Sequence, residues 1–402
     1  MEQMIPLSVP NFSGNEKKYV LDVMESTWVS TAGKQIELFE ESVTKYVGSS
    51  GAVACQSGTA GLHLAMLSLG IGKNDIVLVP TLTFVAAVNP VKYVDASPIF
   101  FDCDDYLTID AKKINDFCKE ECNMINGSLI HKRSKKCVKA IVAVHVFGNM
   151  ANMEKLMEIA KKYNLFIVED ATEAFGTYYT AGKYQGKYAG TIGDIGVYSF
   201  NGNKIITTGG GGMVVSNSLQ LLKKCKHLST QAKSDLLYFN HDEIGYNYRM
   251  TNIQAALGLA QLEQIEKFIS VKKNNYEYYN SLGIKLLPFR KNIRPNYWFY
   301  SYKTFNRDKL ITYLNENKIQ SRPVWKLIHT LRPYEKEYSY KIERANIFYN
   351  NIINLPCSSS LKKEDVDQVA SCIKSFEKLW VNHFSYGFSP KCFRLSPSCR
   401  HP

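Results

Sequence analysis

The sequence has no long hydrophobic run and no recognisable export signal. None of its apolar stretches approaches the roughly 18 to 20 residues that a membrane-spanning helix requires. The first residues, MEQMIPLSVP, lack the basic region followed by an apolar run that marks a secretory signal peptide. We therefore expect a cytoplasmic protein that does not enter the membrane.

Closely spaced metal ligands are also missing. The ten cysteines are dispersed along the chain, and no two of them form a Cys-x-x-Cys pair. Structural zinc sites usually depend on such pairs, so the sequence predicts no metal site. In a reducing cytoplasm the cysteines are not expected to form disulfides.

Signals for nucleic-acid and dinucleotide binding are absent as well. No Gly-x-Gly-x-x-Gly follows the first predicted strand, which argues against a Rossmann dehydrogenase. No helix-turn-helix appendage or basic N-terminal arm is recognisable, so we expect no nucleic-acid partner. The net charge of +12 is scattered, and its densest cluster, at residues 132–136, is typical of a solvated loop. The charge alone does not choose between nucleic acid, an anionic membrane surface and a phosphorylated small molecule as the partner.

What the sequence does contain is an alternation of strands and helices. Hydrophobic residues make up 45% of the sequence, which is typical of a folded globular protein. The length of 402 residues favours one large domain with a smaller one attached. Short β-branched runs alternate with segments of helical period, which is typical of βαβ units and a mostly parallel sheet. The predicted strands are GAVAC at 51–55, DIVLVP at 75–80, PIFFDCD from 98, AIVAVHV from 140, LFIVED from 165, DIGVYSF from 194 and GMVVS from 212.

The second half of the chain has a different character. Residues 250–273 are rich in Ala and Gln and have a helical period, which predicts a long helix at a domain boundary. We therefore predict a large α/β domain at 1–255, a small α+β domain at 256–380 and a tail of unassigned role at 381–402.

A lysine followed by glycines is the strongest candidate for a catalytic site. Lys204 follows the strand that ends near Ser199, and glycines occupy positions 209–212. A lysine in partly apolar surroundings has a lowered pKa, so its amine can act as a nucleophile and form a Schiff base. A lone lysine is more often an ordinary surface residue beside a flexible turn, so this interpretation depends on the other motifs.

A second motif ends the predicted strand LFIVED with Glu169 and Asp170. Carboxyl ends of strands are where open α/β sheets bind ligands. A carboxylate there could face the pyridine nitrogen of pyridoxal phosphate (PLP), whose protonated ring is an electron sink. A helix N-cap is the alternative, because Asp is favoured at that position.

Two further segments follow predicted strands. Gln56–Ala60 lies between a strand and a helix, where free backbone N–H groups and the helix dipole favour a phosphate; a capped helix start without ligand is the alternative. Pro80–Phe84 follows the next strand, and Phe84 could stack on a flat ring, although most such residues belong to the core.

These elements occur together with VHVFG at 144–148 and GYNYRMTNIQAALGLAQLE at 245–263. In this order and spacing they resemble the PLP-dependent nucleotide-sugar aminotransferases of the DegT, DnrJ and StrS group. The resemblance covers about residues 5–376 and is closest to the LegC-like branch, which acts in the making of legionaminic acid and related surface sugars. It implies the fold-type-I aminotransferase architecture, with a large, mostly parallel α/β domain and a small C-terminal α+β domain.

The resemblance also implies roles for particular residues. Lys204 would carry the cofactor as a Schiff base and move protons, with Asp170 at the pyridine nitrogen and Phe84 stacked on the ring. Gly58, Thr59 and Ser199 would hold the phosphate.

Other roles implied by the resemblance concern the rim of the site. Asn247 would reach the phosphate of the neighbouring subunit's cofactor, so that a homodimer shares its sites, and Trp28 and His329 would line the substrate side. Glu173 would lie near the cofactor's phenolic oxygen, where many members carry Gln or His. Two acceptors would repel one another there unless one of them is protonated.

The implied reaction moves an amino group, with glutamate as the expected donor, to a nucleotide-linked 4-keto-6-deoxy sugar. A UDP- or GDP-linked 2-acetamido sugar is expected, in bacterial surface-polysaccharide or nonulosonic-acid biosynthesis. Sugar dehydratases of this family replace the Schiff-base lysine with histidine, so Lys204 favours transamination. A non-enzymatic PLP-bound regulator is the alternative of another class.

Overall fold

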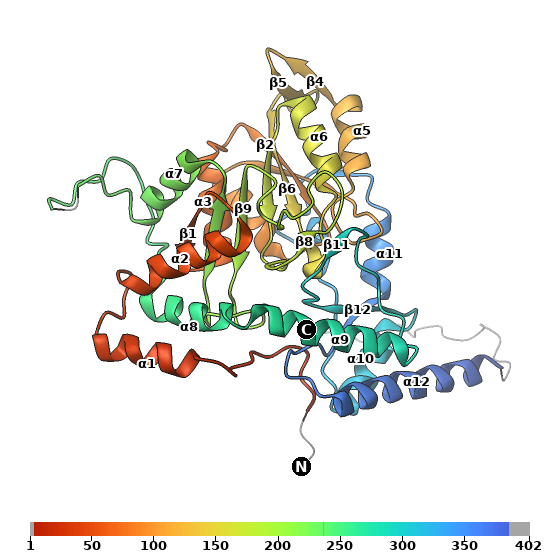
Figure 1. Cartoon of the computed structure of the whole chain (residues 1–402). Coiled ribbons are helices and arrows are strands. Elements are labelled where there is room, and N and C mark those ends of the chain that lie inside the picture. Colours follow the sequence, from red (N-terminus) through yellow and green to blue (C-terminus); the bar gives the residue numbers. More distant parts are fainter. Residues whose placement is uncertain (1–3, 236, 386–402) are drawn as a thin grey trace, which may run out of the picture.

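A twisted sheet of ten strands forms the centre of the protein. The computed structural model describes residues 4–235 and 237–385, and Figure 1 shows the course of the chain. The strand order is β1-β10-β9-β7-β6-β2-β3-β14, and the hairpin β4–β5 is attached to β6. The strands are β1 (Gly51–Cys55), β2 (Asp75–Pro80), β3 (Ser97–Phe101), β4 (Cys122–Ile125), β5 (Ser128–His131), β6 (Cys137–Val144), β7 (Phe166–Asp170), β9 (Ile195–Ser199), β10 (Gly212–Ser216) and β14 (Ser339–Tyr340).

Most of this sheet is parallel. Neighbouring strands from β9 through β7, β6, β2 and β3 to β14 pair in parallel, whereas β10 is antiparallel to both β1 and β9. Each of the seven predicted strands overlaps one of these strands, and the predicted α/β class is confirmed. Because parallel strands end at the same edge, the residues that follow them converge there.

Helices cover both faces of the sheet. Alternate strand residues enter two separate cores: Val77 and Val79 pack on the side of α3 and α7, and Ile76 and Leu78 pack on the side of α2, α5 and α6. The helices are α1 (Glu16–Ser26), α2 (Lys34–Val47), α3 (Gly58–Ser68), α4 (Asn89–Tyr93), α5 (Ala111–Glu120), α6 (Met153–Tyr163), α7 (Leu219–Ser229), α8 (Asn252–Leu262), α9 (Ile265–Ser281), α10 (Arg307–Glu316), α11 (Arg344–Asn351) and α12 (Lys363–Ser385), with short 3-10 turns at η1 (Val85–Ala87), η2 (Val146–Gly148) and η3 (Ile328–Thr330).

The long helix predicted at 250–273 is in fact two helices. Thr251 and Gln254 form a reciprocal capping box that begins α8, and the helical hydrogen bonding is interrupted at residues 263–264 before α9 starts. Figure 1 shows α1 lying alongside α8, with α9 continuing beneath the sheet. The helical period was therefore recognised correctly, but the break within it was not.

The basic cluster at residues 132–136 lies in a loop, as predicted, and this loop directly follows a β-hairpin. Strands β4 and β5 pair antiparallel through a two-residue turn at Asn126 and Gly127, both of which have positive φ. An Asn-Gly pair favours this type of turn because both residues tolerate the left-handed conformation. The basic residues at 132–136 follow the second strand of the hairpin.

The C-terminal part has a small sheet of its own. Its antiparallel strands lie in the order β12-β15-β13, and a two-stranded ladder joins β8 to β11 elsewhere. The bounds are β8 (Tyr178–Tyr179), β11 (Ile293–Arg294), β12 (Tyr300–Lys303), β13 (Arg322–Pro323) and β15 (Ile352–Leu355). Within the aromatic run NYWFYSYKTF at residues 296–305, only β12 is a strand.

Contacts cross the predicted domain boundary in both directions. Ile5 forms a β-bridge with Ile319, and the Cys357 N–H donates to the Leu7 carbonyl, so the N-terminal segment joins the C-terminal part. In return, β14 pairs with β3 of the large sheet. The division into domains at residue 255 stays a prediction, but the two parts are closely tied.

The predicted tail begins inside a helix. α12 continues to Ser385, whereas residues 386–402 lie outside the described part of the chain. Within the described residues, no helix combines the length and the apolar character needed to cross a bilayer.

Candidate functional site

A cavity of about 630 Å³ lies where the parallel strands end. Asp170 ends β7, Ser199 ends β9 and Phe84 follows β2, and all three line the cavity. Four other predicted site residues also line it, namely Gly58, Thr59, Glu173 and Lys204. The cavity thus brings together seven of the residues that the sequence assigned to one site.

Lys204 is nearly enclosed, with 12% of its side chain exposed. Its Nζ lies 4.0 Å from Glu173 Oε1 and 4.2 Å from the centroid of the Trp298 ring. Burial lowers the pKa of Lys204, and the negative charges of Glu173 and Asp170 oppose that shift. The lysine is therefore not the exposed surface residue that was the alternative interpretation.

Glu173 is held by a strained loop. Its Oε2 accepts a hydrogen bond of 2.7 Å from the Phe147 N–H, and Phe147 has a φ of 57°, which is unusual for a bulky residue. Burial raises the pKa of Glu173, while the charge of Lys204 opposes the increase. The VHVFG motif thus supplies the backbone donor that fixes this carboxyl group.

Asp170 is almost fully buried, with 3% of its surface exposed. Its Oδ1 accepts a hydrogen bond of 3.1 Å from the Thr172 N–H. Burial raises the pKa of Asp170, and the Thr172 hydrogen bonds and the charge of Lys204 act against this. Residues 171–177 form turns rather than a helix, so the helix-cap alternative for Asp170 does not hold.

A buried network lies behind Asp170. Fully buried His145 donates from Nε2 to Glu169 Oε2 at 2.8 Å, and its Nδ1 accepts from the Ala151 N–H at 3.0 Å. Glu169 also accepts hydrogen bonds from three backbone N–H groups within residues 190–193. The backbone N–H of His145 also donates to the backbone carbonyl of Asp170, so this network fixes the end of β7.

The start of α3 forms a tight cradle opposite the end of β9. The Ser57 side chain accepts from the Ala60 N–H at 3.0 Å, so the N–H groups of Gly58 and Thr59 remain at the cavity wall. A Cβ added to Gly58 would lie 2.9 Å from Ser199 Cβ, and one added to Gly212 would lie 2.6 Å from the Ser57 backbone. These glycines are needed because neighbouring chain segments approach closely there.

Sequence reasoning missed an aromatic wall. Trp298 and Trp325 line the cavity, and Phe147 packs beside Trp325 with ring centroids 4.6 Å apart. Trp298 Nε1 donates to the carbonyl of Asn203 at 2.7 Å, directly before Lys204. Trp298 belongs to the aromatic run NYWFY at residues 296–300, and nothing local to that run points to the site.

Three predicted residues lie away from the cavity of this chain. Asn247 is exposed and forms a β-bridge with Thr230, and 63% of Trp28 is exposed. His329 Nδ1 lies 2.6 Å from Thr81 Oγ1 and does not line the cavity. The role expected for Asn247 concerns a neighbouring subunit and stays a prediction, and the substrate roles of Trp28 and His329 gain no support from their positions.

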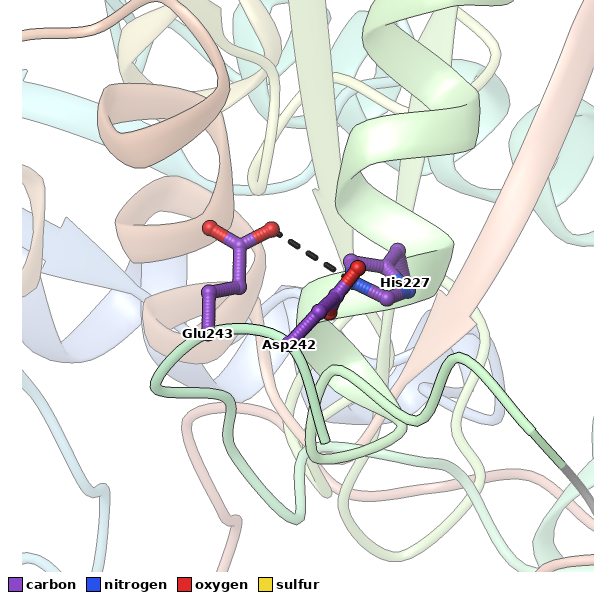
Figure 2. Close-up of side chains that lie close together, drawn as sticks. All are labelled: His227, Asp242 and Glu243. Carbon is purple, nitrogen blue, oxygen red and sulfur yellow. Dashed lines mark hydrogen bonds and ion pairs between the residues drawn. The ribbon is translucent and has the colours of Figure 1, made fainter. Parts of the chain in front are cut away.

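A second polar cluster lies on the surface, at the C-terminal end of α7. Figure 2 shows His227 beside Asp242 and facing Glu243, and its Nε2 lies 2.7 Å from Asp242 Oδ1 and 3.4 Å from Glu243 Oε1. Glu243 is also paired with Lys224. Because these groups already have partners on the protein, we interpret the cluster as a tether for the loop that precedes α8.

Comparison with known proteins agrees with this geometry. Residues 10–374 match the DegT/DnrJ/EryC1/StrS aminotransferase family. The chain is 40% identical over 379 residues to the GDP-perosamine synthase of Escherichia coli O157:H7, covering 92% of this chain and 98% of that protein.

Two solved structures share the fold. PseC of Helicobacter pylori, an aminotransferase involved in pseudoaminic acid biosynthesis, superposes with a TM-score of 0.82 at 26% identity, covering 94% of this chain and 100% of that one. The PLP form of Spr1654 from Streptococcus pneumoniae gives a TM-score of 0.83 at 23% identity, covering 94% and 99%.

The Glu173→Gln substitution tests the electrostatic coupling at Lys204. Loss of the carboxylate removes a charge that raises the pKa of Lys204, so that pKa should fall further below its ordinary value. The pH dependence of reductive methylation at Lys204 in the apoenzyme, followed by peptide mass spectrometry, should then show a midpoint at lower pH than in the wild type. Glu41→Gln, at an exposed position, is the control; an unchanged or higher midpoint in Glu173→Gln would show that the two groups are not coupled.

Proposed function

Because the chain belongs to the DegT/DnrJ/EryC1/StrS aminotransferase family, we propose that it transfers an amino group from L-glutamate to a GDP-linked 4-keto-6-deoxy sugar. The observation that carries this proposal is the enclosure of Lys204 in one cavity with Asp170 and Glu173. The GDP-perosamine synthase relative favours GDP over the UDP alternative. These comparisons do not confirm the LegC-like branch expected from the sequence.

The cavity suits the family's cofactor, PLP. Gly58 and Thr59 N–H groups and the Ser199 hydroxyl would hold its phosphate, because a helix N-terminus favours an anion. Asp170 would face the pyridine nitrogen, and Phe84 would cover the ring. When bound, PLP withdraws electrons from the carbon whose proton is removed, which is the chemistry that amino-group transfer requires.

Lys204 supplies the proton transfer in this proposal. A lysine whose pKa is lowered by burial is a neutral amine more often than an exposed one, so Nζ can accept a proton and return it. Glu173 Oε1 lies 4.0 Å from this nitrogen. The pKa of Glu173 is raised by burial, so the group can be protonated and need not repel an acceptor on the cofactor.

A sugar dehydratase is the rival activity within the family. Those members carry histidine where this chain has Lys204, and the structure places the Lys204 amine inside the cavity. Transamination is therefore favoured.

We also propose that the enzyme works as a homodimer with shared sites. Asn247 is exposed near a segment that presents Tyr238 and Ile244, which are 75% and 85% exposed, and α1 presents Met24 at 56%. Large exposed apolar residues of this kind are common at subunit contacts. Sedimentation velocity of the holoenzyme would show a dimer, whereas an active monomer would contradict the shared site.

The substrate proposal can be tested directly. Holoenzyme incubated with L-glutamate and a GDP-linked 4-keto-6-deoxyhexose should form one 2-oxoglutarate for each GDP-linked amino sugar, measured by mass spectrometry. The matched UDP-linked 2-acetamido acceptor should have a lower kcat/KM, and Lys204→Ala should form neither product. Equal or better turnover of the UDP-linked acceptor would overturn the choice of nucleotide.

Asp170→Asn tests the role proposed for the buried carboxylate. Asn is nearly isosteric, so folding and cofactor binding should largely survive, but the charge that keeps the pyridine nitrogen protonated is lost. We expect single-turnover rates at saturating PLP to fall roughly 10² to 10⁴-fold, by analogy with the removal of one preorganised charge-stabilising group. A loss smaller than about threefold would mean that Asp170 has only a structural role.

A further inference from the structure

One wall of the cavity carries hydrogen-bond donors that no step proposed above uses. Gln320, Arg322 and Asn354 line the cavity from the C-terminal part of the chain. In the small sheet, Asn354 lies directly opposite Ser301 on one side and Arg322 on the other. Residues directly opposite one another in antiparallel strands project from the same face, so Arg322 and Asn354 reach the cavity side by side.

The two amide side chains are oriented by the protein. Asn354, which is 2% exposed, accepts at Oδ1 from the Ser301 hydroxyl at 2.8 Å. Gln320 accepts at Oε1 from the Leu7 N–H at 2.9 Å. Within residues 4–235 and 237–385, neither amide nitrogen has a protein acceptor. Each amide therefore has its oxygen occupied and its N–H groups free to donate.

Arg322 adds an unneutralised charge to this wall. Among the described residues that line the cavity, Lys204 and Arg322 are the basic ones, and Lys204 already lies near Glu173 and Asp170. No carboxylate of the described chain pairs with Arg322. A guanidinium group presents a planar fork of donors that matches carboxylate and phosphate oxygens.

We propose that Gln320, Arg322 and Asn354 form an anion-binding subsite for the substrates, and that Arg322 determines its affinity. This rests on the proposed function, because both substrates of that reaction are anions. The shared chemistry is a pair of anionic oxygens, from either the carboxylate of the amino donor or the diphosphate of the nucleotide. The unpaired positive charge of Arg322, together with amide N–H groups that are free to donate, favours such a ligand over a neutral sugar ring.

The test uses two unreactive probes on the holoenzyme. Glutarate presents carboxylates without an amine, and GDP presents the diphosphate without the sugar. Calorimetric titration of Arg322→Gln should show a Kd raised roughly ten- to a hundredfold for at least one probe, as expected when a charge-assisted hydrogen bond is lost. Arg322→Lys keeps the positive charge but not the planar fork of donors, so its Kd should rise less than that of Arg322→Gln.

The matched control is Arg332→Gln, at an exposed position that does not line the cavity, and its Kd values should equal those of the wild type. If Arg322→Gln loses affinity for glutarate alone, the subsite belongs to the amino donor, and if it loses affinity for GDP alone, the subsite belongs to the nucleotide. If it loses affinity for both probes, the two substrates use the subsite in turn. The proposal would be overturned if Arg322→Gln retains its cofactor absorbance and binds both probes with Kd values within twofold of the wild type.

Failure of the proposed function would give a different result. A wild-type holoenzyme that binds the probes but transfers no amino group to the GDP-linked sugar would contradict the substrate assignment. The difference in probe binding between the wild type and Arg322→Gln would still decide whether the anion subsite exists.

Discussion

The enclosure of Lys204 with two carboxyl groups is the constraint on which the rest of the site depends. Burial disfavours the charged form of each of the three groups, and it is offset by the attraction of Lys204 to each carboxylate and by a few hydrogen bonds, while the two carboxylates repel one another. The fold supplies those bonds: Phe147 adopts a left-handed conformation to donate to Glu173, and the Glu169–His145 network fixes the strand that ends at Asp170. The enclosure thereby lowers the pKa of Lys204.

Much of this arrangement could be predicted from the sequence because its signals are local. The seven predicted strands, out of the ten in the large sheet, are short β-branched runs, and Asp170 and Ser199 lie at the ends of two of them. Because these strands are parallel, their carboxyl ends lie at the same edge of the sheet. A lone lysine is expected at the surface, and only the agreement of several separate motifs predicted that Lys204 lies in one cavity with Asp170 and Ser199.

The parts that could not be predicted depend on tertiary contacts. Trp298 covers Lys204 although 94 residues separate the two in sequence, and Asn354 reaches the same cavity from β15. Neither has a local signal beyond its residue type. The interruption between α8 and α9 was hidden because both helices continue one apolar pattern, and Glu173 could be seen as a departure from the family pattern before its burial was known.

The central claim, that Lys204 binds the cofactor covalently, is tested most directly by borohydride reduction of the holoenzyme followed by peptide mapping, because only an imine is fixed in this way. Lys272 is an internal comparison: burial also lowers its pKa, but it donates to the Cys357 carbonyl and does not line the cavity. The account predicts the cofactor mass on the Lys204 peptide alone. A label on Lys272 or another lysine, or none in cofactor-saturated enzyme, would contradict it.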